Sequence, residues 1–545
     1  MILFKRDGEF TPKLVSLWRE GYGLSALRAD IMAGLTVAIV ALPLSMAIAI
    51  ASGVGPERGL FTAIIGGFLV SLLGGSRYQI GGPAGAFIVL IAACVAQIGI
   101  PGLVLATFLS GLMLVGVALF RLGTYVRFIP YPVTLGFTAG IALIIFASQI
   151  KDLLGLSLAG EPADILHKLA ALWAARGSLN PAALAVTVGT ILTIVGLKRA
   201  APALPNLLIA VVLAAVAAAA LQLPVETIHS RFGELPRVPP APSLPPMTVD
   251  LVFAALPWAA SFTLLGAIES LLSAVVADGM SGRRHRPNAE LLAQGVANMG
   301  AALFGGICVT GTIARTATNV RAGSRGPVSG LLHAAFVLVF MLVAAPFAGY
   351  IPLAALAAVL AVVAWNMAEK EPMWQLIRTS RADAVVLLAT FLLVVFRDLT
   401  EGIVVGFALG GLVFIHRMSQ AASVDQGGDE APVAHNGAVV YKLHGPYFFG
   451  AAAKLGIALD QLAEAPRGLV MDFTDVPFID STGARSFELL ALKLARKGEV
   501  LFLIGTRPEV AAVLVKAGVS EPEARFLPDL AAVDQVLAQH AAPRP

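Results

Sequence analysis

The apolar positions of this chain form long uninterrupted runs rather than the one-faced patterns of water-soluble proteins. Several runs, such as residues 30–52, reach the roughly 20 residues that a helix needs to span a bilayer. The pattern predicts a polytopic α-helical membrane protein with fourteen segments, several of them short. The expected segments are 30–52, 58–75, 84–98, 102–121, 130–150, 181–197, 204–222, 250–277, 290–306, 315–321, 328–347, 352–367, 383–396 and 400–417.

The pattern changes after residue 417. Residues 418–436 are polar and are typical of a linker. From 437 to 541, short strand-like apolar runs alternate with amphipathic stretches, and this alternation predicts a small cytoplasmic α/β domain. The sequence therefore divides into an N-terminal segment (1–24), a membrane domain (25–417), the linker and the C-terminal domain (437–541).

Two stretches repeat one pattern at matching places in two halves of seven segments each. Residues 72–87 (LLGGSRYQIGGPAGAF) and 303–318 (LFGGICVTGTIARTAT) both carry a Gly-Gly pair, a strand-like run and a break before a new helix. Interrupted segments in corresponding positions indicate the central site of a transporter. An odd number of segments per half makes the repeats inverted, so the two helix N-termini face each other and attract an anion. A glycine-rich turn for helix packing is the alternative, and a phosphate-binding loop is disfavoured because no Gly-Lys-Ser/Thr follows.

Two ionisable residues fall within apolar segments. Arg315 lies at the start of the second interrupted helix, where it favours an anion site because a buried arginine needs a cavity or a partner. Glu269 is a candidate for taking up and releasing a proton, and Ser273 lies one turn further on the same face. Two alternatives remain open. Arg315 could lie at the membrane surface with Arg321 and Arg325, and Glu269 could be a static partner of Arg315 or a helix-packing group.

Composition supports a membrane protein and excludes other classes. The chain is 57% hydrophobic and 13% charged, against about 25% charged in soluble proteins. The net charge of +4 does not indicate nucleic acid, because the basic residues lie in short loops that fall mostly on one side, which predicts cytoplasmic N- and C-termini. Cys94 and Cys308 are expected to be packing residues, and no metal or other cofactor is expected. An enzyme is not expected either, because the sequence offers no convincing nucleophile–base pair.

Four motifs together carry a family resemblance. The stretches DIMAGLTVAIVALPLSMAIAIASGVGPERGLFTAIIGG, GGSRYQIGGPAGAF, GAIESLLSAVVADGM and TGTIARTATNVRAG resemble the sulfate permease (SulP) family of anion transporters, also called solute carrier family 26. The C-terminal domain, with FIDSTGARSFELL, resembles the family's STAS domain. The resemblance implies a seven-plus-seven inverted repeat divided into core and gate domains. It also implies a homodimer and an elevator-like movement of the core, and we expect a bacterial-type inner membrane.

The resemblance also implies roles for individual residues. Glu269 matches the position of a coupling carboxylate, and a glutamate there is similar to the proton-coupled members, which makes sodium the less expected ion. The hydroxyls of the STAS loop match a phosphorylation switch, although such a loop can also be only a helix N-cap. The implied substrate-binding residues are Leu44, Ile48, Ala84, Gly85, Ala86, Ala314, Arg315 and Thr316, the coupling residues are Glu269 and Ser273, and the regulatory residues are Asp480, Ser481 and Thr482.

One departure from the family pattern bears on the substrate. Pro43 is followed by Leu44, where many sulfate-type members have Pro-Gln. Together with GAIESLL and AWNM, this resembles bacterial carriers of C4-dicarboxylates. The sequence therefore predicts a proton-coupled secondary transporter of succinate, fumarate or sulfate. The expected partners are this anion, the proton, the lipid bilayer, a second copy of the chain and a candidate cytoplasmic protein on the STAS domain, but no nucleic acid. A sodium-coupled bicarbonate transporter, a passive anion channel and a STAS-led membrane sensor are the open alternatives.

Overall fold

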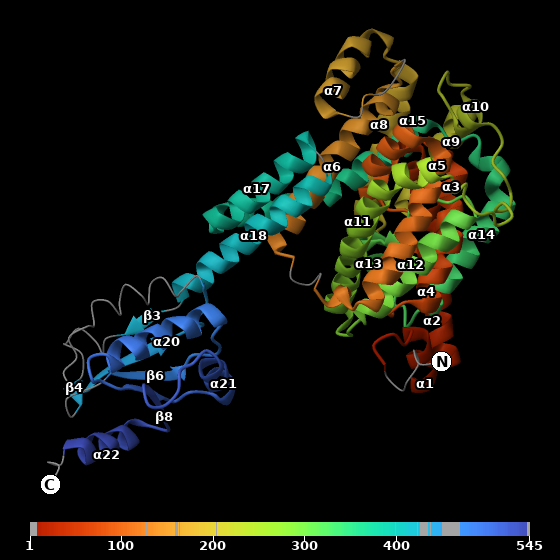
Figure 1. The fold of residues 1–545 in the computed structure, drawn as a ribbon. Coiled ribbons are helices and arrows are strands. Elements are labelled where there is room, and N and C mark those ends of the chain that lie inside the picture. The colour runs from red at the N-terminus through yellow and green to blue at the C-terminus, as the bar shows by residue number, and fades with distance from the viewer. Residues whose placement is uncertain are drawn as a thin grey trace. The chain divides into compact units, whose positions relative to one another are not determined.

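The chain forms two compact units, Met1–Phe407 and Ala408–Pro545 (Figure 1). The computed structural model describes residues 8–125, 129–158, 162, 164–202, 204–397, 399–421, 423–425, 434–435, 438–449 and 469–541. Parts of the predicted N-terminal segment, linker and STAS domain lie outside these described residues.

The first unit consists of apolar helices, and a helix covers each of the fourteen predicted segments. In the described part of the chain, nine helices are long and apolar enough to cross a membrane. The number of membrane crossings stays a prediction. The helices are α1 (Lys13–Glu20), α2 (Leu24–Ala51), α3 (Pro56–Phe61), α4 (Gly67–Leu73), α5 (Ile88–Leu119), α6 (Tyr131–Leu154), α7 (Ile165–Ala174), α8 (Pro181–Ala200), α9 (Asn206–Ala220), α10 (Ile228–Phe232), α11 (Val249–Ser281), α12 (Pro287–Leu303), α13 (Ile313–Arg321), α14 (Val328–Ala348), α15 (Leu353–Met367), α16 (Lys370–Thr379), α17 (Arg381–Phe396) and α18 (Leu399–Ala421).

Helix α5 combines two segments that the sequence pattern separates at residues 99–101. The structure contains one element with a non-helical residue inside it, Gly99, whose φ is 71°. Pro101 follows directly, and a proline inside a helix removes a backbone hydrogen bond. The predicted separation into 84–98 and 102–121 is therefore confirmed, because α5 consists of two helices that meet at a kink at Gly99.

The helices of the first unit pack mainly within two sets. One set comprises α2, α4, α5, α11, α12, α13 and α14, and the other comprises α6, α8, α9, α15 and α17. We call them the core set and the gate set, after the two domains that the family resemblance implies. Both interrupted helices belong to the first set, so the predicted site is built on the core.

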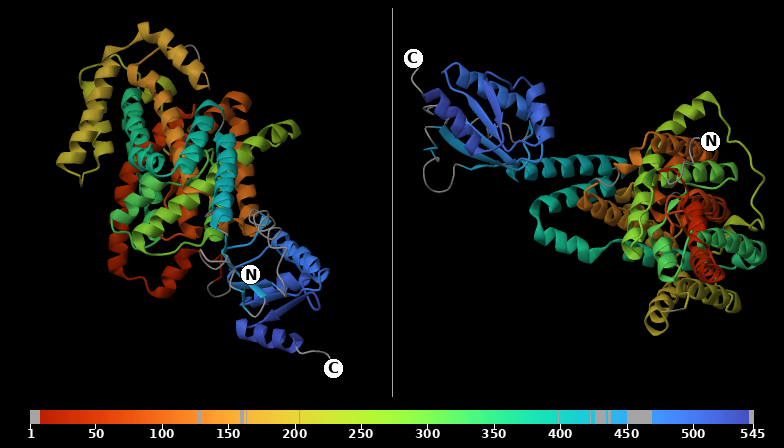
Figure 2. Two further views of the ribbon diagram at one scale, coloured as in Figure 1. Left: turned by 90° about the vertical axis from the view of Figure 1, so that its left-hand side faces the viewer. Right: turned by 90° about the horizontal axis from the view of Figure 1, so that it is seen from below.

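The second unit is a mixed sheet with helices on both faces (Figure 2). Its strands lie in the order β3-β5-β6-β7-β8, with β5 to β8 parallel. Leu469 and Met471 of β6 face α20 and α21, whereas Val470 between them faces α22, as the period of a strand requires. The elements are β3 (Ser423–Asp425), β4 (Ala434–His435), β5 (Ala438–His444), β6 (Leu469–Asp475), α20 (Ser481–Ala495), β7 (Leu501–Ile504), α21 (Pro508–Lys516), β8 (Ala524–Leu527) and α22 (Leu530–Ala541).

The boundary predicted at residues 418–436 is partly wrong. Helix α18 continues to Ala421, and β3 and β4 both pair antiparallel with β5. Part of the predicted linker therefore belongs to the sheet, because a polar stretch can supply an edge strand through its backbone alone.

Candidate functional site

The two interrupted segments meet through a short antiparallel pair of strands. Strand β1 (Gly81–Gly82) pairs with β2 (Thr310–Gly311), with Gly81 opposite Gly311. Antiparallel strands run in opposite directions, so the helices that follow them leave the strand pair in opposite directions. We call β1 with the helix start that follows it the first crossing, and β2 with the helix start that follows it the second crossing. The strand-like runs are as predicted, and their pairing is a new finding that satisfies backbone groups which lipid could not satisfy.

The helix start in each crossing has no side-chain cap. The first repeat continues into the 3-10 helix η2 (Gly85–Phe87) and α5, after Ala84. The second continues into α13, after Thr312. Neither preceding residue makes a side-chain cap hydrogen bond, so the first-turn amides of both helices stay open to a ligand.

Arg315 is buried inside the core rather than at the membrane surface. The residue is only 1% exposed. Its Nη2 donates to Ser45 Oγ of α2 at 3.1 Å and to the carbonyl oxygen of Pro83 at 3.2 Å. Its Nε and Nη1 are buried and have no partner. The surface-loop alternative for Arg315 is therefore wrong, and the guanidinium reaches across to the first repeat.

A layer of hydroxyl groups joins α11 to the second crossing. Ser273 Oγ donates to Thr316 Oγ1 at 3.1 Å, and the amide of Ile80 donates to the same oxygen at 3.1 Å. One turn earlier on α11, Ser270 Oγ and Thr310 Oγ1 share a hydrogen bond of 2.7 Å. Thr316 thus ties both repeats to α11, and Ser273 acts on the site through Thr316.

Glu269 lies on α11 beside this layer, and one carboxylate oxygen is left without a partner. Its Oε2 is buried and accepts no hydrogen bond. Among the ion pairs of the described residues none joins Glu269 to Arg315, and the guanidinium instead bonds Ser45 and Pro83. The alternative of a static ion pair is therefore wrong in this structure, and the carboxyl group keeps a free oxygen inside the protein.

The predicted substrate-binding residues differ in how much surface they offer. Ala314 is exposed and Gly85 is half-buried. A methyl group placed on Gly85 would lie 3.3 Å from Ile145 Cδ1 of α6, so the gate set approaches the first crossing there. The remaining predicted residues, Leu44, Ile48, Ala84, Ala86, Arg315 and Thr316, are all buried.

Helix α12 carries polar residues that the sequence analysis did not single out. Glu290 accepts from the amide of Ser76 at 3.0 Å and from Gln79 Nε2 at 3.1 Å. The Asn298 side chain donates from Nδ2 to the carbonyl oxygen of Val309 and accepts at Oδ1 from the amide of Val309. The helix therefore holds the chain leading into each crossing. Glu290, Gln294 and Asn298 recur every four residues in an apolar helix, and this signal in the sequence could have revealed them.

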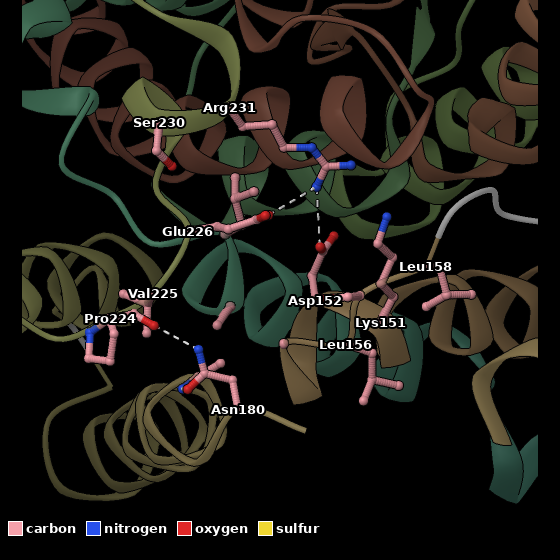
Figure 3. Close-up of a pocket in the computed structure, with 15 residues that line it drawn as sticks. Lys151, Asp152, Leu156, Leu158, Asn180, Pro224, Val225, Glu226, Ser230 and Arg231 are labelled. Atoms are coloured by element: carbon pink, nitrogen blue, oxygen red, sulfur yellow. Dashed lines mark hydrogen bonds and ion pairs between the residues drawn. The ribbon is translucent and has the colours of Figure 1, made fainter. Parts of the chain in front are cut away.

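A separate cavity of about 590 Å³ lies among the gate helices and involves none of the predicted site residues (Figure 3). Arg231 donates there to Asp152 Oδ1 at 3.3 Å and lies 3.8 Å from Glu226 Oε2. Lys151 and Asn180 also line it. The two cations and two carboxylates balance in charge, so the cavity shows no preference for an anion.

The predicted regulatory loop begins α20 in the second unit. Asp480 is the N-cap residue, and its carboxylate accepts from the amides of Gly483 at 2.8 Å and Phe449 at 3.0 Å. Ser481 and Thr482 are exposed in the first turn. The capping function therefore belongs to the aspartate, and both hydroxyls are free of it.

The described residues contain no cluster of metal-ligating side chains. Cys94 and Cys308 are buried and free, and Cys308 Sγ lies 3.4 Å from Thr107 Oγ1. Both cysteines pack inside the core set, as expected.

Comparisons with known proteins agree with this architecture. Residues 27–390 match the sulfate permease family, and residues 431–531 match the STAS domain. The chain is 40% identical to the putative sulfate transporter YvdB of Bacillus subtilis, over 92% of this chain and 95% of that protein. It is 30% identical to the bicarbonate transporter BicA of Synechocystis, over 92% of each chain.

A solved structure shows the same fold. The murine anion transporter Slc26a9, in its inward-facing state, superposes with a TM-score of 0.83 at 19% identity, covering 97% of this chain and 94% of that one. The chain is a multi-pass membrane protein that belongs to the sulfate permease family of anion transporters and carries a C-terminal STAS domain.

Proposed function

We propose that this transporter couples the movement of a small oxyanion to a proton carried by Glu269. The observation that carries the proposal is the pairing of β1 with β2. It brings together two uncapped helix N-termini and the buried Arg315, whose Nε and Nη1 lack partners. Two positive helix ends and a guanidinium favour an anion and disfavour a cation.

The unpaired state of Glu269 supports its role in coupling. A carboxylate locked in an ion pair with Arg315 would have to break that pair before it could accept a proton. Here the Oε2 atom has no partner, and Ser273 beside it is engaged with Thr316. A titratable group also favours a coupled transporter over a passive channel, which needs none.

The names of the relatives bear on the substrate. They are a putative sulfate transporter at 40% identity and a bicarbonate transporter at 30% identity. Neither name mentions a dicarboxylate, so only the sequence resemblance at Leu44, GAIESLL and AWNM supports succinate or fumarate. We therefore rank sulfate and bicarbonate ahead of the C4-dicarboxylates, and bicarbonate keeps sodium as the alternative coupling ion.

Uptake into proteoliposomes tests the proposal. Sulfate, bicarbonate, succinate and fumarate would each be supplied with and without proton and sodium gradients. The expected result is saturable uptake of one oxyanion that an inward proton gradient accelerates. Uptake that depends on sodium alone would contradict proton coupling, and conductance without saturation would indicate a channel.

Glu269→Gln sharpens the same assay. The variant keeps the shape of the side chain but cannot be ionised, so the proton gradient should no longer accelerate uptake, while exchange of anion across the membrane persists. Glu371→Gln, at an exposed position on α16, is the matched control and should behave as the wild type. A Glu269→Gln protein that still responds to the proton gradient would contradict the coupling role.

The STAS loop supports a proposal of regulation. Ser481 and Thr482 are exposed at the N-terminal turn of α20, where a phosphate would meet the positive end of the helix dipole. A cytoplasmic protein partner at this loop is a further prediction. A homodimer, the elevator-like movement of the core, the inner-membrane location and the cytoplasmic termini likewise remain predictions from the resemblance and from the charge bias.

A further inference from the structure

Three of the buried side chains whose polar atoms have no partner in the described protein lie near α4. They are Arg315 of α13, with Nε and Nη1 unpaired, His333 of α14, with both ring nitrogens unpaired, and Ser71 of α4, with Oγ unpaired. His333 is 0% exposed. Each unpaired buried group costs free energy. A neutral imidazole has one nitrogen that donates a hydrogen bond and one that accepts, so both need partners.

The polar groups of all three side chains lie against one face of the helix that η1 and α4 form together. The π-helix η1 (Thr62–Gly66) continues directly into α4, and the small residues Ala63, Gly67 and Ser71 recur there every four residues. A methyl group placed on Gly82 of β1 would lie 2.4 Å from Arg315 Nη1 and 3.8 Å from the Cα of Ala63. The guanidinium therefore meets this face at Ala63.

His333 and Ser71 meet the same face further along. A methyl group placed on Gly67 would lie 3.9 Å from His333 Cδ2 and 3.0 Å from the carbonyl oxygen of Gly81. One placed on Gly330 would lie 2.1 Å from Ser71 Oγ. Gly330 and His333 are three residues apart on α14 and so point to the same side.

The hydrogen-bonding chemistry of the two ionisable groups is complementary. Arg315 Nη1 and both ring nitrogens of His333 are buried without a partner, so no direct hydrogen bond joins them. A neutral imidazole can accept from one neighbour and donate to another, whereas a guanidinium only donates. A molecule that both accepts and donates would complete the set.

We propose that α4, α13 and α14 enclose buried water that connects Arg315 Nη1 to His333 and, one turn further along α4, to Ser71, while Arg315 Nε remains for the anion. Such a water would have the two to four polar partners that a buried water requires. His333 is then a positioning residue for the guanidinium. Ser45 and Pro83 hold Nη2 of the guanidinium, and the water on His333 would hold Nη1. Arg315 would then keep one orientation whether or not an anion is bound. This role rests on the proposed function of Arg315.

High-resolution cryo-electron microscopy of the full-length chain tests the water site directly. We expect density for water within hydrogen-bond distance of a His333 ring nitrogen and of Arg315 Nη1 in the wild type, and its loss in His333→Leu. An empty site, or a direct bond between His333 and Arg315, would overturn the inference.

Binding measurements test the positioning role. With sulfate and bicarbonate as probes, His333→Leu should bind the preferred anion roughly tenfold more weakly, while His333→Gln, which keeps a donor and an acceptor, should stay within about twofold of the wild type. Met341→Leu, a buried apolar change on the same helix, controls for packing. Equal affinity of the Leu and Gln variants would overturn the positioning role. If the wild type binds neither probe, the proposed function fails, while the density still decides the water site.

Discussion

The two crossings occupy equivalent places in the two repeats but contribute different chemistry. The first consists of Gly81 and Gly82 and leads into a helix through Ala84 and Gly85, so it offers backbone and space. The second carries Thr310, Thr312, Arg315 and Thr316, so it offers hydroxyl groups and a cation. The fold therefore supplies two opposed helix starts, but only the second carries a charged side chain, Arg315.

The asymmetry has a steric origin. Arg315 extends from the second repeat into the first, where its Nη1 lies within 2.4 Å of a methyl group placed on Gly82. Gly82 is therefore small because the arginine of the second crossing fills the space beside it, whereas a methyl group on Gly81 would meet Val70 at 2.7 Å. Changes to the two crossings should consequently differ in size.

Removal of the guanidinium should have the largest effect. Arg315→Ala deletes the hydrogen bonds to Ser45 and Pro83 and the cation itself. Hydrogen bonds to charged groups are worth about 1.5–3 kcal/mol, so the affinity for the preferred oxyanion should fall roughly 10- to 100-fold. Isothermal titration of the purified full-length chain measures this.

Arg315→Lys serves as the matched variant because it keeps the charge but not the planar fork. It should bind more tightly than Arg315→Ala and more weakly than the wild type. Unchanged affinity in Arg315→Ala would show that the helix ends alone hold the anion.

A methyl group on the first crossing should have the next largest effect. Gly82→Ala places a carbon against Arg315 Nη1, so the guanidinium must move and its bonds to Ser45 and Pro83 must lengthen. We expect roughly tenfold weaker anion binding. Gly116→Ala on α5, where nothing lies within 4 Å of the added carbon, is the control. Equal binding by both variants would contradict the steric link between the crossings.

The sequence predicted the parts of this arrangement that depend on local pattern. The Gly-Gly pairs, the strand-like runs and the new helices near residues 84 and 314 are all visible as one repeated motif. The direction of the Arg315 side chain was not predictable, because its partners lie in α2 and in the other repeat. The spacing between Ser45 and Arg315 in the chain carries no signal of their contact.

The STAS unit shows the same limit. The β6, α20, β7 and α21 stretches follow from alternating patterns, and the structure contains all four. The sequence pattern does not distinguish strand β3 from a linker, because its pairing with β5 depends on backbone hydrogen bonds and not on an apolar pattern. Likewise, the assignment of the α20 cap to Asp480 rather than to the hydroxyls required the fold.

The hydroxyl layer on the second crossing should have a smaller effect. Thr316→Val and Ser273→Ala each remove one partner of the 3.1 Å hydrogen bond between these side chains. Side-chain hydrogen bonds between membrane helices average about 0.6 kcal/mol in double-mutant cycles, so the coupling free energy should be of that order. Unfolding of the two single variants and the double variant in detergent measures it.

Thr316→Ser separates the hydroxyl from the methyl group. It keeps the oxygen that accepts from Ser273 and from the Ile80 amide, so its free energy of unfolding should lie closer to the wild type than that of Thr316→Val. A coupling free energy of zero would show that the second crossing is held by its backbone, as the first is.

A methyl group on Gly85 should have the smallest effect. The added carbon would meet only the terminal Cδ1 of Ile145, at 3.3 Å, and the end of an isoleucine side chain can turn away at little cost. Gly85 is also free of the positive φ that demands glycine, so alanine fits its backbone. We expect anion affinity within about twofold of the wild type, well below the effect of Gly82→Ala, because the carbon added at Gly82 meets the buried guanidinium whereas the carbon added at Gly85 meets only the end of a side chain. A loss as large as that of Gly82→Ala would show instead that the anion or α6 fills the space at Gly85, and the asymmetry between the crossings would then lie in side-chain chemistry alone.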